Sequence, residues 1–173
     1  TDESATYPIQ TQVDLTNWMV MSCPSTGPSG VIVGDTLIYA WRSQNASKIF
    51  IATLNINDQQ IGQHRLLNAI SFGTQNYPVI AAKGDTIGIV WQENYSGATD
   101  VYFSFSTTGV AGLGITVDTL TTSMSATQSR PDLVFNNKKF HVTFSDVIGS
   151  DIVYMEGNIT NIGINELKNN NEI

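Results

Sequence analysis

The side chains best suited to chemistry in this sequence are those that could hold a polar organic ligand. There are seven of them: Arg42, Tyr77, Glu93, Asn94, Tyr95, Arg130 and Asp146. Guanidinium, carboxylate and amide groups hydrogen-bond to hydroxyl groups, and tyrosine rings stack on the apolar faces of sugars. We therefore expect these residues to bind a glycan or a protein partner if the fold brings them together.

Catalysis by this set is a weaker expectation than binding. Glu93 and Asp146 each follow an aromatic residue by two positions, and two carboxylates can divide general acid and base work between them. Such residues more often cap loops or accept hydrogen bonds from nearby amides. Arg130, next to Pro131, is more often a loop residue that bonds backbone carbonyls. We expect no catalytic residue.

The remaining reactive residue types add little. Cys23 is the one cysteine and has no basic neighbour in sequence, so it reads as a small, partly buried side chain rather than a reactive thiol. His64 and His141 are far apart, and no phosphate-binding glycine loop or metal-binding histidine pair is present. We expect His141 to be a packing residue, and we expect neither a cofactor nor a metal.

An internal repeat organises the chain that must position these residues. Three segments align without gaps, each from a proline to an aromatic residue: 28–41, 78–91 and 131–144. Similarity continues into three more apolar segments: 48–53, 100–105 and 151–156. Trp41, Trp91 and Phe144 end the first segments at equivalent positions. Because they recur at strand ends, we predict that they pack in a core and do not serve as sugar platforms.

Each repeat is predicted to form four short strands. A Gly-Asp turn joins the first two, and apolar residues on both faces of the second strand indicate a sheet that is covered on both sides. Four-stranded repeats of this length indicate blades of a β-propeller. We expect an all-β chain of about three four-stranded antiparallel blades, half of a six-bladed ring or a fragment of a larger propeller. The predicted units are a leading segment over 1–27 and blades over 28–77, 78–130 and 131–173.

These motifs resemble those of the sialidase-like (neuraminidase-repeat) β-propellers. The resemblance rests on the proline-led strands, the Gly-Asp turns, the strands ending in Trp and the segment 100–106, and it covers roughly residues 28–167. Residues 106–109 are similar to the opening of the family's Ser-x-Asp-x-Gly-x-Thr-Trp box but lack its Asp and Trp. Active members use an arginine cluster, a Tyr–Glu pair and an acid/base Asp, whereas this chain has three arginines in all.

The resemblance also implies where ligands bind. In these propellers the ligand face carries the loops between second and third strands and the segments that enter each blade. Here those are two sets of residues: the loops 42–47, 92–99 and 145–150, and the entry segments 75–77 and 128–130. This face, called the loop face below, holds the seven candidate residues.

Three blades cannot close a ring, so an open arc would expose a blade face at each end. We expect a second copy to complete a six-bladed ring, or further blades of a larger chain to cover these faces. In the first case residues 8–15, predicted as a lone outer strand, would complete the partner's last blade.

Composition excludes several classes of protein. The net charge of −7 argues against binding to nucleic acid and to anionic membrane surfaces, and no run of about 18 apolar residues predicts membrane insertion. The low charged fraction of 13% and the many Asn, Ser and Thr residues favour a secreted or cell-surface protein. We expect a non-catalytic module that binds glycans or a protein. The alternative is a fragment of a sialidase-like glycoside hydrolase whose catalytic set is completed by blades not present here.

Overall fold

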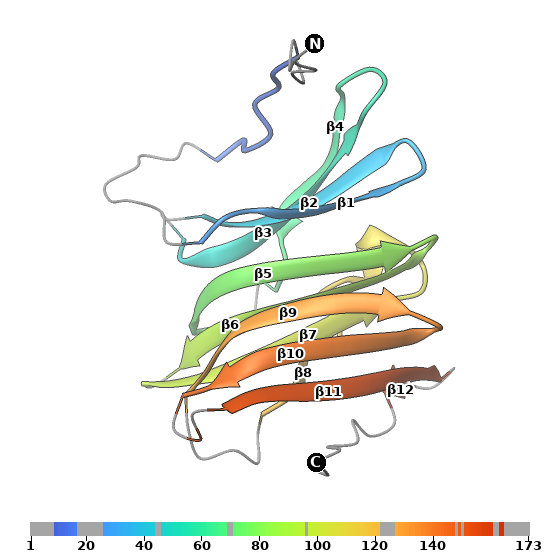
Figure 1. The fold of residues 1–173 in the computed structure, drawn as a ribbon. Helices are drawn as coiled ribbons and strands as arrows, with labels where there is room; N and C mark the ends of the chain where they lie inside the picture. The colour runs from blue at the N-terminus through green and yellow to red at the C-terminus, as the bar shows by residue number, and fades with distance from the viewer. Residues whose placement is uncertain are drawn as a thin grey trace, which may run out of the picture.

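The computed structural model describes residues 9–16, 26–43, 46–68, 71–95, 97–121, 127–147, 149, 151–160 and 163–164. They form three separate sheets of four antiparallel strands, which stack face to face with the second sheet in the middle (Figure 1). The all-β propeller class predicted from the repeats is confirmed. The described part contains one short 3-10 helix, η1 (Val110–Gly112), and no described helix is long and apolar enough to cross a membrane.

Each sheet is one blade, and its strands follow the chain from the inner edge to the outer edge. Blade 1 has β1 (Ser29–Val33), β2 (Thr36–Ser43), β3 (Lys48–Asn55) and β4 (Ile61–Leu66). Blade 2 has β5 (Thr74–Lys83), β6 (Thr86–Tyr95), β7 (Ala98–Ser106) and β8 (Asp118–Thr119). Blade 3 has β9 (Gln128–Asn136), β10 (Lys139–Asp146), β11 (Asp151–Thr160) and β12 (Gly163–Ile164). Contacts between neighbouring blades include those of the inner strands, β1 with β5 and β5 with β9.

Two-residue turns join the first two strands of every blade. Gly34 and Gly84 have positive φ values of 57° and 59°, a conformation that glycine adopts without steric cost. Blade 3 uses Asn137 and Lys138 at the same place, with φ values of 48° and 62°. Blade 3 therefore forms the turn without glycine.

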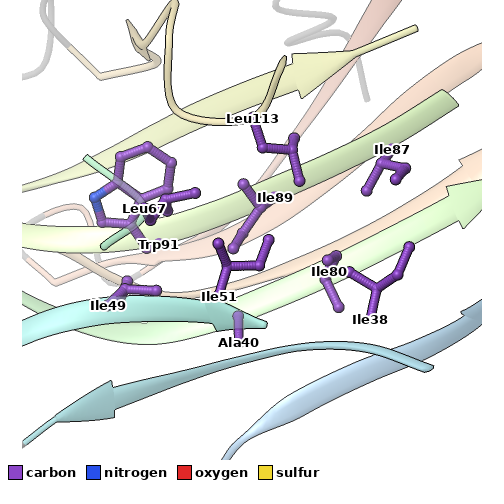
Figure 2. Close-up of a cluster of buried hydrophobic side chains, with 10 residues drawn as sticks. All are labelled: Ile38, Ala40, Ile49, Ile51, Leu67, Ile80, Ile87, Ile89, Trp91 and Leu113. Carbon is purple, nitrogen blue, oxygen red and sulfur yellow. The ribbon is translucent and has the colours of Figure 1, made fainter. Parts of the chain in front are cut away.

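The side chains of the second strands alternate between the two faces of their sheets. Ile87, Ile89 and Trp91 of β6 face blade 1, where they meet buried residues of β2 and β3 (Figure 2). Val90, between them, faces blade 3. In β10 the alternate residues that end at Phe144, the equivalent of Trp91, face blade 2. Where a neighbouring blade is present in the described chain, one side of the second strand thus packs on the preceding blade and the other side faces the following blade.

The inner strands of blades 2 and 3 begin earlier than predicted. Residues 75–77 and 128–130 were expected to be loops entering the blades, but they are the first part of β5 and β9. The sequence signal was misleading because the proline lies within a β-bulge in both strands. Between the pairs Asn76↔Gln92 and Val79↔Val90, β5 holds one residue more than β6. A strand can continue past a bulge with proline because the missing N–H is not required there.

The leading segment is not the lone outer strand expected over residues 8–15. Within the described residues 9–16 no strand is formed. These residues lie instead against the outer face of blade 1, where Val13 packs on Tyr39, Trp41 and their neighbours. Pro8 and Cys23 lie outside the described residues.

Candidate functional site

The loop face is one end of the stacked blades, at the left side of Figure 1. It gathers the ends of β2, β6 and β10, the starts of β3, β7 and β11, and the starts of the inner strands β5 and β9. Five of the seven candidate residues lie at strand ends on this face. Tyr77 and Arg130 lie further along the inner strands, at the bulges of β5 and β9.

Glu93 lies at the centre of a buried hydrogen-bond network, with 5% of its surface exposed. Its Oε1 accepts hydrogen bonds from Gly73 N, at 3.1 Å, and from Ser71 Oγ; its Oε2 accepts from Gln75 Nε2 at 3.0 Å and from Trp91 Nε1 at 3.2 Å. Burial raises the pKa of Glu93, but these four hydrogen bonds outweigh it and hold the pKa below its usual value. The carboxylate is therefore ionised and both of its oxygens are occupied.

The same network ties blade 2 to blade 1. Gln75 Oε1 accepts a hydrogen bond from Ile49 N, at the start of β3, at 2.9 Å. Lys48 Nζ, next to it, donates to Ser71 O at 2.9 Å, to Ser71 Oγ at 3.3 Å and to Gly73 O. A lysine of blade 1 thus fixes the segment that enters blade 2, and this segment lies on the loop face.

Blade 3 carries a shorter version of the same pair. Gln128 lies opposite Asp146 as Gln75 lies opposite Glu93. Gln128 is fully buried, yet its Nε2 and Oε1 have no hydrogen-bond partner in the described part of the chain. Asp146 Oδ1 instead accepts a hydrogen bond from Gly149 N at 3.4 Å. Because aspartate is one methylene shorter than glutamate, the half-buried carboxylate of Asp146 bonds to the loop that follows β10 and does not hydrogen-bond to the Gln128 amide.

The two bulge residues, Tyr77 and Arg130, have left-handed φ values of 51° and 52°, which are uncommon for residues with a Cβ atom. Arg130 is exposed, and its backbone N donates to Gln92 Oε1 of blade 2 at 3.0 Å. Arg42 has the position of Gln92 in blade 1. Its Nη2 donates to Ser47 Oγ at 3.4 Å, and its buried Nε has no partner among the described residues.

Two aromatic side chains stand exposed on the loop face at the end of blade 2. Phe72 is 90% exposed and Tyr95 is 58% exposed. Thr74 pairs with Asn94 across β5 and β6, so the two aromatic residues flank this strand pair; we call them the aromatic platform. Asn94, also exposed, donates from Nδ2 to Thr99 Oγ1 at 3.0 Å. Phe72 was missed from sequence because it precedes the aligned repeat; its only signal was an aromatic residue between Ser71 and Gly73.

The aromatic residues that end the second strands are core residues, as predicted. Trp91 and Phe144 are fully buried between blades, and Trp41 is 9% exposed beneath residues 9–16. Arg65 has a structural role: its Nη2 donates to Val110 O at 2.9 Å and to Leu113 O at 2.8 Å, which joins β4 to blade 2.

The two histidines are not brought together. His141, expected to be a packing residue, is half-buried on the face of blade 3 away from blade 2, where its ring stacks on that of Tyr154 and its Nδ1 lies 2.8 Å from Tyr154 Oη. His64 lies beside Trp41 in blade 1. Among the described residues, no group of three or more His, Cys, Asp and Glu side chains is arranged to hold a metal ion.

No protein-family model matches the sequence, and no curated protein matches it. Among solved structures, an exo-1,5-α-L-arabinanase from a bovine ruminal metagenomic library matches with a TM-score of 0.55 and 9% identity, over 82% of this chain and 55% of that one. A GH43 endo-arabinanase from Bacillus licheniformis matches with a TM-score of 0.37 and 8% identity, over 78% of this chain and 71% of that one. The chain spans about half the length of the first structure. The likeness shows a propeller fold and does not single out the sialidase type.

Proposed function

We propose that this chain is a non-catalytic module that binds glycans at its loop face, through the aromatic platform of Phe72 and Tyr95. The observation that supports this most is the 90% exposure of Phe72, held by an entry segment that Lys48 fixes to blade 1. An exposed phenylalanine side chain buries little apolar area and so contributes little to the stability of the fold, whereas it is suited to stack on the apolar face of a sugar ring.

Polar groups near the platform support a ligand rich in hydroxyl groups. The exposed Asn94 lies beside Tyr95, and the half-buried Asp146 and exposed Arg130 belong to the same face of blade 3. One carboxylate and one guanidinium offset each other in charge, which favours a neutral glycan over a strongly charged one. A protein ligand would more often require a larger apolar patch. We also propose that the module lies outside the cell or on its surface, which the low charged fraction of 13% supports.

The alternative is that the chain is part of a glycoside hydrolase, as its likeness to an arabinanase structure invites. Hydrolysis of a glycosidic bond requires a carboxylic acid that can give up a proton near neutral pH. Glu93 is unsuited to this role because its oxygens are saturated and its pKa is lowered. The geometry therefore supports binding more than it supports catalysis.

The test is glycan binding by the full chain on an array that includes 1,5-α-linked arabino-oligosaccharides. The double variant Phe72→Ala/Tyr95→Ala should lose at least about tenfold in affinity, because each stacking contact contributes about 0.5–1.5 kcal/mol beyond its buried area. Ile115→Ala is the matched control: this residue is 78% exposed but follows β7, at the opposite end of blade 2. Equal binding by the double variant would refute the placement of the site, and release of sugar by the wild-type chain would favour the hydrolase.

A further inference from the structure

The outer face of blade 1 has the side-chain pattern of a face that meets another blade. In the second strands of blades 2 and 3, the residues on the same face as Trp91 and Phe144 pack on the preceding blade. The corresponding residues of blade 1 are Leu37, Tyr39 and Trp41. No blade precedes them in the described chain, and yet Tyr39 and Trp41 are 5% and 9% exposed.

Residues 9–16, called the strap from here on, cover this face. Val13 packs on the apolar cluster, and Val13 O accepts a hydrogen bond from Tyr39 Oη at 2.9 Å. Asp14 Oδ2 accepts from Trp41 Nε1 at 3.0 Å, and Leu15 N donates to His64 Nε2 at 3.3 Å. Burial, with the charge of Asp14, raises the pKa of Tyr39 to about 12. The strap therefore satisfies the polar ends of the side chains that it covers.

Blade 1 differs from blade 2 at the positions that fit the strap. In blade 2 the indole of Trp91 donates to Glu93 of its own strand. In blade 1 the residue at that position is Ser43, and the indole of Trp41 donates to Asp14 of the strap instead. Tyr39, whose hydroxyl also needs the strap, stands where blade 2 has an isoleucine. A second blade packed here would leave both polar atoms without these partners, and burying an unpaired polar atom is costly.

Blade 3 ends the stack in a different way. Its face away from blade 2 carries His141 and Thr143, at the positions where β2 has Ile38 and Ala40. Around them, Lys139 pairs with Glu156, and Tyr154 Oη lies 2.8 Å from His141 Nδ1. This network of polar side chains can face water, although the apolar side chains of Val134 and Ile152 are also exposed there.

We propose that the strap replaces a neighbouring blade, so that the occupant of the outer face of blade 1 is the chain's own residues 9–16. The three described blades then stand as an open arc in solution. A second copy could close a six-bladed ring only by displacing the strap and by packing an apolar face on the polar face of blade 3.

The test compares the mass of the full chain by sedimentation equilibrium with the exchange of the Trp41 indole proton by NMR. The wild type should sediment as a monomer with a protected indole proton. Val13→Asp/Asp14→Ala should expose the cluster: indole exchange should rise at least about tenfold, as expected for the loss of a hydrogen bond to a charged acceptor. The variant should also bind an apolar dye and self-associate. Thr11→Ala is the control, because Thr11 Oγ1 donates to Gln59 Oε1 at 2.8 Å, away from Trp41.

Asp14→Asn guards against a variant that simply unfolds, since asparagine keeps an acceptor for the indole and should keep most of its protection. A wild-type chain that sediments as a dimer would overturn the proposal. So would unchanged indole exchange in a folded Asp14→Ala chain. Either result would mean that the strap does not hold this face closed.

Discussion

Replacement of Glu93 by alanine should destabilise the protein more than any other single change on the loop face. The substitution leaves three buried donors without their acceptor: Gly73 N, Gln75 Nε2 and Trp91 Nε1. Each such group costs about 1–3 kcal/mol, so simple addition gives about 3–9 kcal/mol. Because Ser71 can turn to water and neighbours relax, we expect about 3–5 kcal/mol, a large part of a typical stability of about 5–15 kcal/mol.

Equilibrium unfolding in urea measures this loss directly as a lower midpoint with an unchanged slope. Asp146→Ala is the matched control at the equivalent position of blade 3. It removes one long hydrogen bond from Gly149 N, at 3.4 Å, and should cost less than about 1 kcal/mol. If Glu93→Ala and Asp146→Ala cost the same within error, then the carboxylate network does not join blades 1 and 2 as described.

Three further predictions follow from the same interfaces. Asp146→Glu should stabilise the chain by about 1 kcal/mol, because the longer carboxylate can reach the unpaired amide of Gln128. Unfolding in urea measures this gain, and adding Gln128→Leu should abolish it in the double variant. Hydrogen bonds hold the folded pKa of Glu93 below its ordinary value of 4.5, so its stabilising effect should be full above pH 4.5 and should be lost as the pH falls through the folded pKa. The difference in unfolding free energy between wild type and Glu93→Gln, measured against pH, should shrink over the same range. Gly88→Ala should lower the free energy of unfolding by about 1–3 kcal/mol, because the new Cβ would lie 2.3 Å from Phe140 Cε1. A variant as stable as wild type would show that blades 2 and 3 pack more loosely than described.

The sequence predicted the blades because their signals are local and repeated. Gly34 and Gly84 mark the tight turns, and Trp41 and Trp91 mark the ends of buried strands at a constant offset. Strand boundaries were predicted less well. A proline usually ends a pattern of pairing, and nothing in the sequence before it shows that a bulge lets the strand begin earlier.

The candidate site was predicted only in outline, because it depends on contacts between different blades. The sequence placed Glu93 on the loop face but could not show that Gln75 and Trp91 would saturate it, since that requires the register of β5 against β6. Likewise, no local pattern shows that Phe72 is exposed. Residues 8–15 were predicted as an outer strand, and their local sequence does not show that Val13 and Asp14 would accept hydrogen bonds from Tyr39 and Trp41 of blade 1.

The bulges and prolines of the inner strands also bear on solubility. β1, β5 and β9 are the first strands of their sheets, so each has an edge with no partner strand in the described chain. Unpaired edges invite strands from other molecules and can seed fibres. In β5 and β9, Pro78 and Pro131 remove an N–H group just past the kinks at Tyr77 and Arg130. An incoming strand would meet a broken row of donors, which lowers the tendency of these edges to pair with strands of other molecules.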